Sequence, residues 1–293
     1  MELVTSLAPW RQRAEEVRRG NATVALVPTM GALHAGHVAL LATAREQCDY
    51  VIATIFVNPR QFNSVADLAL YPRTTQADHE ICERAGVDLL VEPTVKEMWP
   101  NYPGATFTTV SVGGVAERFE GADRPGHFDG VASVVNKLFN VTGECHAYFG
   151  EKDFQQLAVV RQMILDLAMP ASLVACRTVR DDDGLALSSR NARLSQSGRT
   201  EALALAHTVL DFNENRTYEV DEVRTMLERF VSTDALVVAY REVVDPLTLE
   251  PCSNNFGGDA RVLVAATIEG VRLLDNGPVM VRPSKGVRRA TGH

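Results

Sequence analysis

Short apolar runs alternate with amphipathic stretches over the first 180 residues of the chain. Short runs of apolar and β-branched residues predict buried strands, and apolar positions that recur every third or fourth residue predict helices. The predicted strands are Ala22–Pro28, Tyr50–Val57, Val87–Val91, His146–Phe149 and Ser172–Cys176, and the predicted helices are Gly36–Gln47, Gln76–Ala85, Phe128–Val141 and Asp153–Ala168. This alternation indicates βαβ crossovers and therefore an α/β fold, with a Rossmann-like parallel sheet covered by helices on both faces.

The pattern changes after Asp181. Two helix-period segments precede three strand candidates: the segments are Gly198–Phe212 and Val220–Phe230, and the strands are Leu236–Val244, Arg261–Ala266 and Val271–Leu274. We therefore expect a large domain at 1–180, a smaller α+β domain at 181–283 and a disordered tail at 284–293. Two polar stretches, Asn58–Arg73 and Asn101–Pro125, are long for loops and are expected to cover a ligand.

Composition and charge limit the classes of partner. The 293 residues carry a formal net charge of -8, which argues against binding nucleic acid or an anionic membrane. No apolar run approaches the roughly 20 residues that a membrane span requires, and the charged N-terminus lacks the apolar core of a signal peptide. The five cysteines are odd in number and never form Cys-x-x-Cys, so we expect buried, reduced thiols in a cytoplasmic protein.

The segment Pro28–His37 follows the first predicted strand and leads into the first predicted helix. Unpaired N–H groups and the helix dipole make such a helix start suitable for an anion. His34 and His37 are three residues apart, so their imidazoles share one face of the first turn. The pattern predicts a phosphate site, although two solvated histidines or half a metal site would look the same.

Two further clusters also follow predicted strands. Asn58 and Gln61 offer amide donors and acceptors that could orient a small polar ligand. Gly150 allows close approach of a ligand, and Lys152 after it supplies a mobile charge for phosphate oxygens. Gln156 lies one turn inside the following helix. Taken singly, each cluster also fits an ordinary turn, cap or exposed ion pair.

A fourth cluster lies after the acidic triplet 181–183. Ser188, Ser189 and Arg190 place two hydroxyls and a guanidinium in sequence, which suits a polyphosphate. Ordinary turn chemistry would produce the same sequence, and the adjacent carboxylates would repel phosphate unless they are bridged by a cation. The chain contains neither Gly-x-x-x-x-Gly-Lys-Ser/Thr nor Gly-x-Gly-x-x-Gly, so a P-loop and a conventional dinucleotide fold are disfavoured. The four clusters together predict chemistry on a nucleoside triphosphate.

These motifs resemble a known family. His34-Ala35-Gly36-His37 is similar to the His-x-Gly-His signature of the nucleotidylyltransferase superfamily, and Ser188–Arg190 resembles its second phosphate loop. The longer strings resemble one member family, the pantoate–β-alanine ligases or pantothenate synthetases. They are Pro28–His37, Phe56–Phe62, Tyr71–Thr74, Gly150–Asp153 with Gln156, Asp183–Asn191, Glu242–Pro246 and Arg272–Asn276. The resemblance runs from about residue 22 to 280.

The resemblance implies a reaction. Members of the family join (R)-pantoate to β-alanine with ATP through a pantoyl adenylate, and they release AMP and pyrophosphate on the way to coenzyme A. It implies Mg²⁺ as cofactor, a homodimer, residues 1–180 as the ATP- and pantoate-binding domain and 181–283 as a lid. Catalysis then requires positioning and charge stabilisation and no protein nucleophile.

The resemblance also assigns residues to roles. The implied catalytic residues are His37, His34, Lys152, Ser188, Ser189 and Arg190, with His37 acting as proton donor or as an imidazolium facing pyrophosphate and Lys152 contacting the α-phosphate. The implied ATP-binding residues are Met30, Gly31, Ala32, Leu33, His34, Ala35, Gly36, His37, Gly150, Glu151, Lys152, Asp153, Val179, Leu187, Ser188, Ser189 and Arg190. Pantoate is assigned to Met30, Asn58, Gln61 and Gln156, and β-alanine is assigned to Gln61. Mg²⁺ is assigned to Asp78, although the simpler interpretation of Asp78 is an exposed residue of a helix.

Three departures from the family pattern stand out. Arg60 occupies a position where an apolar residue is expected, Leu187 replaces a methionine, and Asp181-Asp182 replaces Glu-Ala. Two other functions stay open at this point. One is a different nucleotidylyltransferase, whose phosphorylated acceptor would require a cation in place of Gln61 and Gln156. The other is a nucleotide-binding module without catalysis, which the retained histidines and Lys152 disfavour.

Overall fold

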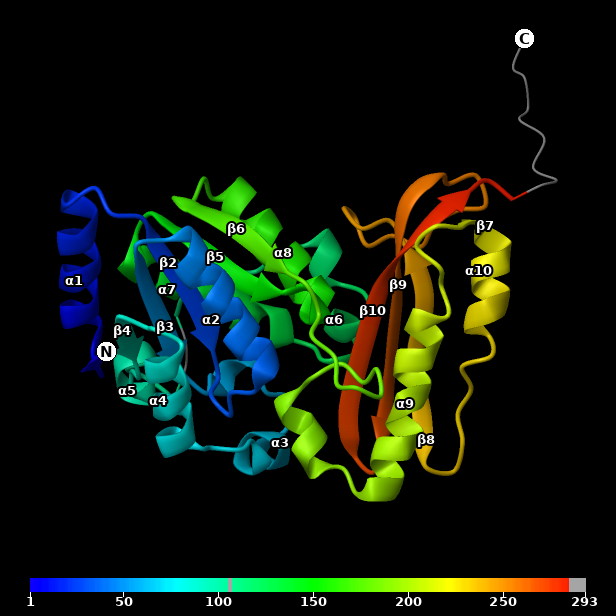
Figure 1. Cartoon of the computed structure of the whole chain (residues 1–293), viewed down its shortest axis with the longest axis horizontal. Helices are drawn as coiled ribbons and strands as arrows, with labels where there is room; N and C mark the ends of the chain where they lie inside the picture. Colours follow the sequence, from blue (N-terminus) through cyan, green and yellow to red (C-terminus); the bar gives the residue numbers. More distant parts are fainter. Residues whose placement is uncertain (105–106, 285–293) are drawn as a thin grey trace, which may run out of the picture. The chain divides into compact units, whose positions relative to one another are not determined.

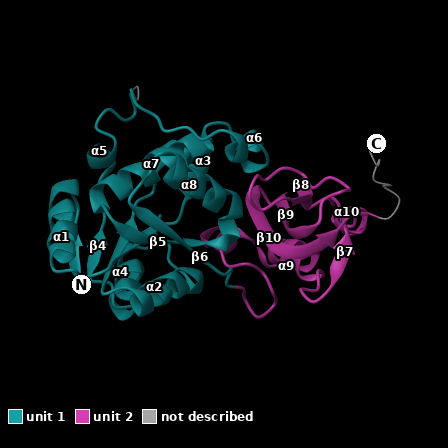
Figure 2. Cartoon of the chain, turned by 90° about the horizontal axis from the view of Figure 1, so that it is seen from above, with its two compact units in different colours: residues 1–179 teal, residues 180–293 magenta. Residues whose placement is uncertain are grey.

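The computed structural model describes residues 1–104 and 107–284. The chain divides into two compact units, Met1–Val179 and Arg180–His293, which Figure 2 colours separately. The sequence placed the domain boundary one residue later, between 180 and 181. The predicted tail at 284–293 lies outside the described residues except for Ser284, which is buried.

Unit 1 contains a six-stranded sheet in which every pairing is parallel, and its strand order is β1-β4-β3-β2-β5-β6. The strands are β1 (Glu2–Val4), β2 (Val24–Thr29), β3 (Tyr50–Ile55), β4 (Leu89–Val91), β5 (Cys145–Gly150) and β6 (Ala171–Cys176). The central strands β2 and β3 are buried along nearly their whole length, as expected for strands covered on both faces. The predicted parallel sheet is confirmed.

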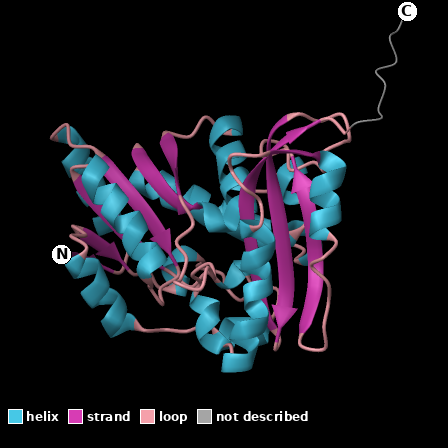
Figure 3. Cartoon of the chain, turned by 45° about the vertical axis from the view of Figure 1, so that its right-hand side comes forward, coloured by secondary structure: helices cyan, strands magenta, loops and turns pink. Residues whose placement is uncertain are grey.

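Helices cover both faces of this sheet (Figures 1 and 3). On one face, α2 (Ala35–Gln47) contacts β2, β3, β5 and β6 and packs on α4 (Thr75–Arg84). On the other, α7 (His127–Thr142) packs against both α1 (Leu7–Arg19) and α8 (Phe154–Asp166). The shorter helices are α3 (Val65–Leu70), α5 (Val95–Met98) and α6 (Glu120–Asp123), with 3-10 turns η1 (Pro59–Gln61), η2 (Gly114–Ala116) and η3 (Glu151–Asp153).

The structure adds elements that the apolar pattern did not indicate. The charged N-terminal segment forms β1 and α1, and α1 anchors the fully buried side chains of Trp10 and Ala14. The polar stretch Asn58–Arg73, interpreted as a loop, contains η1 and α3. These helices are short or mostly polar, so too few apolar positions recur in them to reveal a period.

Unit 2 is built on a four-stranded mixed sheet of order β7-β10-β9-β8. Its strands are β7 (Thr217–Glu219), β8 (Leu236–Val244), β9 (Gly258–Ile268) and β10 (Val271–Arg282), and its helices are α9 (Gln196–Leu210), α10 (Val220–Leu227) and the 3-10 turn η4 (Ser189–Arg193). Helix α9 packs on β9 and β10, and α10 packs on β7 and β8. The predicted α+β character of this unit is confirmed.

The predicted strand Val271–Leu274 is too short, because β10 continues to Arg282 through Asp-Asn-Gly-Pro, which looks like a turn. The segment stays extended because it pairs with β9 along its whole length. Buried Asp275 accepts two hydrogen bonds from Arg180, at 2.6 and 2.9 Å, and Asn276 accepts one from Arg261. Partners distant in sequence therefore override the local turn propensity.

The cysteines are all free and buried, as predicted. Burial raises the pKa of both Cys82 and Cys145 to about 12. No helix in the described part of the chain has the length and apolarity that crossing a bilayer requires.

Candidate active site

Three of the predicted clusters lie at the carboxyl ends of three neighbouring strands of unit 1. Strand β2 leads into Met30–His37, β3 leads into Asn58–Gln61, and β5 leads into Glu151–Asp153. The chain proceeds from β2 to β3 and β4 on one side of the sheet and continues with β5 and β6 on the other. The clusters therefore meet at a topological switch point, which is where parallel α/β sheets bind ligands.

His34 and His37 begin helix α2. His34 is the N-cap, and its Nδ1 accepts a hydrogen bond from the backbone N–H of Gly36 at 3.1 Å. In return, Nδ1 of His37 accepts the N–H of His34 at 3.3 Å, which completes a capping box. Because an imidazole nitrogen that accepts cannot also carry a proton, the single proton of each neutral ring is on Nε2. Both rings are therefore Nε2 donors, with centroids 4.2 Å apart.

The surroundings of His37 keep its imidazole neutral. Desolvation, then the neighbouring His34 ring and the Lys152 ammonium, lower the pKa of His37 to about 3, against an opposing contribution from Asp153. Of the two roles expected for His37, the imidazolium is disfavoured at neutral pH, because desolvation opposes a charge on the ring and Nδ1 is already an acceptor. The contributions of Lys152 and Asp153 to the pKa of His37 also show that these two residues lie close to the histidine cluster.

The loop between β2 and α2 has an unusual backbone. Gly31 and Ala32 both have positive φ, +80° and +50°. A Cβ on Gly31 would lie 3.0 Å from Oδ2 of Asp78 and 3.1 Å from Ile55, so glycine is required by both conformation and space. Ala32 is held in its strained conformation by its surroundings, which include the Asp78 carboxylate.

Asp78 lies on α4 and is 2 % exposed. Its Oδ2 accepts the N–H of Ala32 at 2.9 Å, and its Oδ1 accepts the N–H of Leu33 at 2.8 Å and the Thr74 hydroxyl at 3.0 Å. A carboxylate with these three donors fixes the loop that precedes the two histidines. The simpler interpretation of Asp78 as an exposed helical residue is wrong.

The geometry of Asp78 also bears on the predicted Mg²⁺. Magnesium requires near-octahedral oxygen ligands and usually keeps several waters. Both oxygens of this buried carboxylate already accept hydrogen bonds, and no group of three or more His, Cys, Asp and Glu side chains in the described residues is arranged to hold a metal ion. The protein side chains at Asp78 therefore do not fit a dedicated magnesium site, and Asp78 fits the role of a loop clamp.

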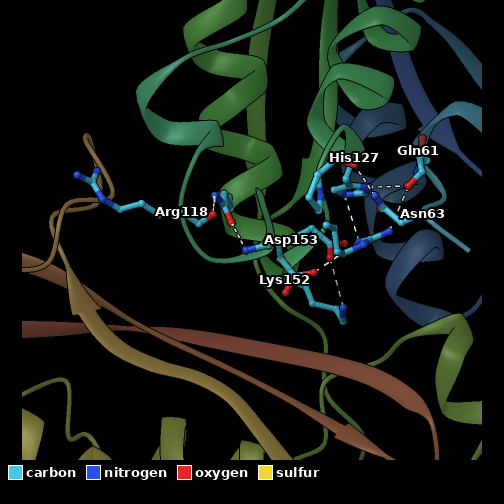
Figure 4. Close-up of polar contacts among 10 residues, drawn as sticks. Gln61, Asn63, Arg118, His127, Lys152 and Asp153 are labelled. Atoms are coloured by element: carbon cyan, nitrogen blue, oxygen red, sulfur yellow. Dashed lines mark hydrogen bonds and ion pairs between the residues drawn. The ribbon is translucent and has the colours of Figure 1, made fainter. Parts of the chain in front are cut away.

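Lys152 and Asp153 occupy the 3-10 turn between β5 and α8. Nζ of Lys152 lies 3.5 Å from Oδ1 of Asp153, and the lysine side chain is only 18 % exposed. Figure 4 shows the pair in the same part of unit 1 as Gln61 and His127. The ammonium is paired with the Asp153 carboxylate and lies close to the His37 ring, where it can serve as a mobile cation for phosphate oxygens.

Asn58 and Gln61 form the polar pocket after β3. Asn58 is 1 % exposed, and its Nδ2 donates to Oε1 of Gln61 at 3.0 Å. Nε2 of Gln61 lies 3.1 Å from the sulfur of Met30, so the second cluster reaches the first. The structure thus brings Met30, His34, His37, Asn58, Gln61 and Lys152 to one end of the sheet.

Helix α7 supports this pocket at very close range. A Cβ on Gly130 would collide with the carbonyl of Arg60 and would lie 2.7 Å from the amide nitrogen of Gln61. Only glycine allows the helix and η1 to approach so closely. Gln156 lies on α8 as predicted and is partly buried, and its assignment to pantoate stays a prediction.

Three residues of this region have no predicted role of their own, although Arg124 lies within the stretch Asn101–Pro125 that we expect to cover a ligand. Nε1 of Trp99 donates to Oδ1 of Asn58 at 3.0 Å. His127 Nδ1 and Arg124 Nη2 both donate to the backbone carbonyl of Gln61, at 2.7 and 3.2 Å (Figure 4). Distance along the chain hides these contacts, because Trp99 lies 41 positions from Asn58, and Arg124 and His127 lie 63 and 66 positions from Gln61.

The fourth cluster belongs to unit 2. Oγ of Ser188 caps η4 by accepting the N–H of Arg190 at 3.3 Å, and the Asn191 side chain donates to the carbonyl of Ala186. Arg199 bridges Asp181 and Asp183 at 2.7 Å each, so a cation does bridge part of the acidic triplet. Val179 ends unit 1, and the roles assigned to Val179, Leu187, Ser188, Ser189 and Arg190 stay predictions.

A parallel α/β sheet with an anion-binding helix start at its switch point is the framework of a nucleotide-binding enzyme. Comparison with known proteins narrows this class. The profile of the family described as pantoate-beta-alanine ligase matches residues 2–278. The chain belongs to this family, and it is an ATP-dependent ligase that forms pantothenate.

Individual relatives agree over nearly the full length. The chain is 47 % identical over 283 residues to a pantothenate synthetase of Cereibacter sphaeroides, covering 94 % of this chain and 99 % of the relative. A pantothenate synthetase of Paracoccus denitrificans is 47 % identical, with 96 % of each chain covered. The crystal structure of pantothenate synthetase from Thermus thermophilus superposes with a TM-score of 0.82 at 41 % identity, covering 94 % of this chain and 98 % of the other.

A further similar structure is that of the pantoate-beta-alanine ligase from Francisella tularensis complexed with beta-gamma ATP and beta-alanine. It is 30 % identical to this chain with a TM-score of 0.77. It covers 94 % of this chain and 97 % of its own.

Proposed function

We propose that the chain activates pantoate by adenylation. A carboxylate oxygen of (R)-pantoate attacks the α-phosphorus of ATP, the bond from phosphorus to the bridging oxygen breaks, and pyrophosphate leaves. The amine of β-alanine then attacks the carbonyl carbon, and AMP leaves as the amide forms and the amine proton passes to solvent. No step requires a nucleophile from the protein.

The observation that carries this proposal is the capping box of His34 and His37. Each ring accepts a backbone N–H at Nδ1, which makes Nε2 the donor of its neutral form. Two such donors at the start of a helix suit the β- and γ-phosphates, where charge develops as pyrophosphate leaves. His37 then acts by hydrogen bonding instead of proton transfer.

Other side chains supply charge and orientation. We assign the Lys152 ammonium to the α-phosphate, because it is half-buried and adjacent to His37. Gln61, with Asn58, Met30 and Gln156, is assigned to pantoate, and Gln61 also to β-alanine, since neutral amides bind a hydroxy acid without an excess of charge. Ser188, Ser189 and Arg190 are assigned to ATP from the unit 2 loop.

Mg²⁺ belongs to this proposal as a companion of the nucleotide. Magnesium at such sites is held largely by substrate phosphates and water, and it reduces the negative charge of the polyphosphate. Because the oxygens of Asp78 are occupied by backbone donors, we assign no direct magnesium contact to that residue.

We also propose a homodimer in the cytoplasm. A reducing location is supported by the five free, buried cysteines.

The dimer is supported by the exposed leucines Leu165 and Leu167 at the end of α8, which packs on the edge strand β6. Light scattering coupled to size-exclusion chromatography tests it, and a monomer mass at micromolar concentration would contradict it.

An omission assay tests the reaction. The purified chain is incubated with ATP, Mg²⁺, pantoate and β-alanine, each omitted in turn, while AMP and pyrophosphate are followed. We expect AMP release to require both organic substrates, and pyrophosphate to exchange into ATP when pantoate alone is present. AMP formation independent of β-alanine, or dependent on a different amine, would contradict the proposal.

A further inference from the structure

The amide of Asn58 has only one possible orientation. Its Oδ1 lies 3.0 Å from Nε1 of Trp99, and an indole N–H can only donate. Its Nδ2 lies 3.1 Å from the carbonyl oxygen of Gly130, which can only accept. If the amide were reversed, two donors would face each other at Trp99 and two acceptors would face each other at Gly130.

The orientation of Asn58 determines that of Gln61. Since the atom of Asn58 that faces Gln61 is the donor Nδ2, the atom of Gln61 that receives it at 3.0 Å is the acceptor Oε1. Nε2 of Gln61 is consequently turned toward the sulfur of Met30, a weak acceptor at 3.1 Å. On the side of Met30, Gln61 therefore presents its N–H groups, which favour a ligand oxygen that accepts.

Trp99 is itself held in place. The guanidinium carbon of Arg60 lies 4.6 Å from the centre of its ring, and Nζ of Lys137 lies 5.2 Å from it. Arg60 donates to the Thr109 hydroxyl at 3.1 Å, and Lys137 donates to the carbonyl of Met98. Arg60 thus has a physical role at a position where the sequence led us to expect an apolar residue: it stacks on Trp99 instead of entering the pocket.

We propose that Trp99 is a positioning residue that fixes the polarity of Gln61 through Asn58, so that Gln61 donates hydrogen bonds to a carboxylate or hydroxyl oxygen of the substrate. The proposal rests on the proposed function in one respect, the assignment of Gln61 to pantoate. Trp99 itself makes no contact with the substrate in this proposal. We expect its effect on the binding of the organic acid, because it acts through Asn58 on Gln61, the residue assigned to pantoate.

Trp99→Phe tests the first contact, because it removes the indole N–H and keeps an aromatic face for Arg60. We expect KM for pantoate to rise about three- to tenfold, the range for losing one hydrogen bond, with kcat and KM for ATP within about twofold of the starting protein. Trp10→Phe is the matched control, since Trp10 is the other tryptophan of the chain and its buried Nε1 has no hydrogen-bond partner among the described residues.

Gln61→Glu tests the polarity directly and does not depend on how Trp99 variants fold. A glutamate can still accept from Asn58, but it has no N–H to offer, and its charge opposes a carboxylate. We expect KM for pantoate to rise by about a hundredfold or more, while ATP binding, measured separately by calorimetry, is retained. Pantoate use that is unchanged or improved would show that substrate donates to this residue, which would overturn the proposal.

A double-mutant comparison separates positioning from general damage. In a Gln61→Ala background there is no amide to orient, so adding Trp99→Phe should leave KM for pantoate unchanged. Equal effects of Trp99→Phe with and without Gln61, or an effect equal to that of Trp10→Phe, would contradict the proposal. Failure of the proposed function is distinguishable, because the unsubstituted protein would then show no pantoate-dependent AMP release.

Discussion

The phosphate loop 30–37 and the amide pocket 58–61 follow adjacent strands, yet they are held in place in different ways. In the phosphate loop, the histidines bond to backbone groups two or three residues away. In the amide pocket, the supporting donors and acceptors come from Trp99, Arg124, His127 and Gly130, all distant in sequence. Local motifs therefore define the first site, whereas the tertiary fold defines the second.

The phosphate side also has support from distant residues. Gln61 contacts the sulfur of Met30, and Asp78 fixes two backbone N–H groups of a segment with positive φ at Gly31 and Ala32. The comparison thus predicts different consequences for each side: substitutions on the phosphate side should affect ATP and turnover, and those at the amide pocket should affect pantoate.

The largest expected effect is that of Lys152→Ala. Removing one charge contact that stabilises the transition state typically costs about 10²–10³ in kcat, so we expect a loss of that size, measured under saturating substrates. Lys96→Ala, at an exposed position on α5, is the matched control and should retain full activity. A loss of less than tenfold would show that Lys152 lies outside the reaction centre.

Gly130→Ala tests the amide pocket from outside the substrate site. The added methyl group would displace η1 at Arg60 and Gln61, and we expect the free energy of unfolding to fall by about 2–4 kcal/mol. Gly113→Ala is the control, because its Cβ would find no atom closer than 3.7 Å. If urea denaturation gave the two variants equal stability, the close packing of α7 against η1 would be disproved.

Asp78→Asn tests the long-range clamp on the phosphate loop. Its amide would turn a donor toward the N–H of Ala32 or Leu33, so we expect a loss of about 2–3 kcal/mol in unfolding free energy and weaker ATP binding. The weakening should be the same with and without Mg²⁺ in a calorimetric titration. Weakening that appears only with Mg²⁺ would indicate a metal ligand instead of a loop clamp.

The smallest expected effect is a change in pH dependence caused by His37. Its pKa of about 3 in the folded chain is below the ordinary 6.5, so the unfolded chain binds an extra proton between these values. The stability contributed by the neutral ring is present above about pH 6.5 and is lost as the pH falls toward 3. His37→Gln should therefore lose less stability than the unsubstituted chain between pH 7 and 4.5, as measured by urea midpoints. Parallel losses would contradict the neutral, desolvated ring.

The apolar pattern predicted the parallel sheet because the central strands β2 and β3 are buried along nearly their whole length and strands alternate with helices along the chain. The same pattern missed α1 and α3, whose exposed faces dominate their composition. It also ended β10 at Leu274, because ion pairs such as Arg180–Asp275 form only after the fold brings residues distant in sequence together. Local signals are sufficient where burial alone determines the element.

The candidate site divides in the same way. His34, His37, Asn58, Gln61 and Lys152 were identified from their places after strands, and the structure brings them to one end of the sheet. Trp99 could not be identified, because nothing near residue 99 relates it to Asn58. Asp78 was singled out for a metal, since a carboxylate in sequence gives no indication whether its partners are cations or backbone N–H groups.

The buried thiols have a practical consequence for measuring motion in this enzyme. Maleimide reagents react with thiolates, and burial holds the pKa of Cys82, Cys145 and Cys252 at about 11 to 12. The unaltered chain therefore provides a weakly reactive background for site-specific labelling. Single cysteines introduced at exposed Val65 in unit 1 and Leu247 in unit 2 would accept a fluorophore pair, whose energy transfer would report how the two units respond to ATP.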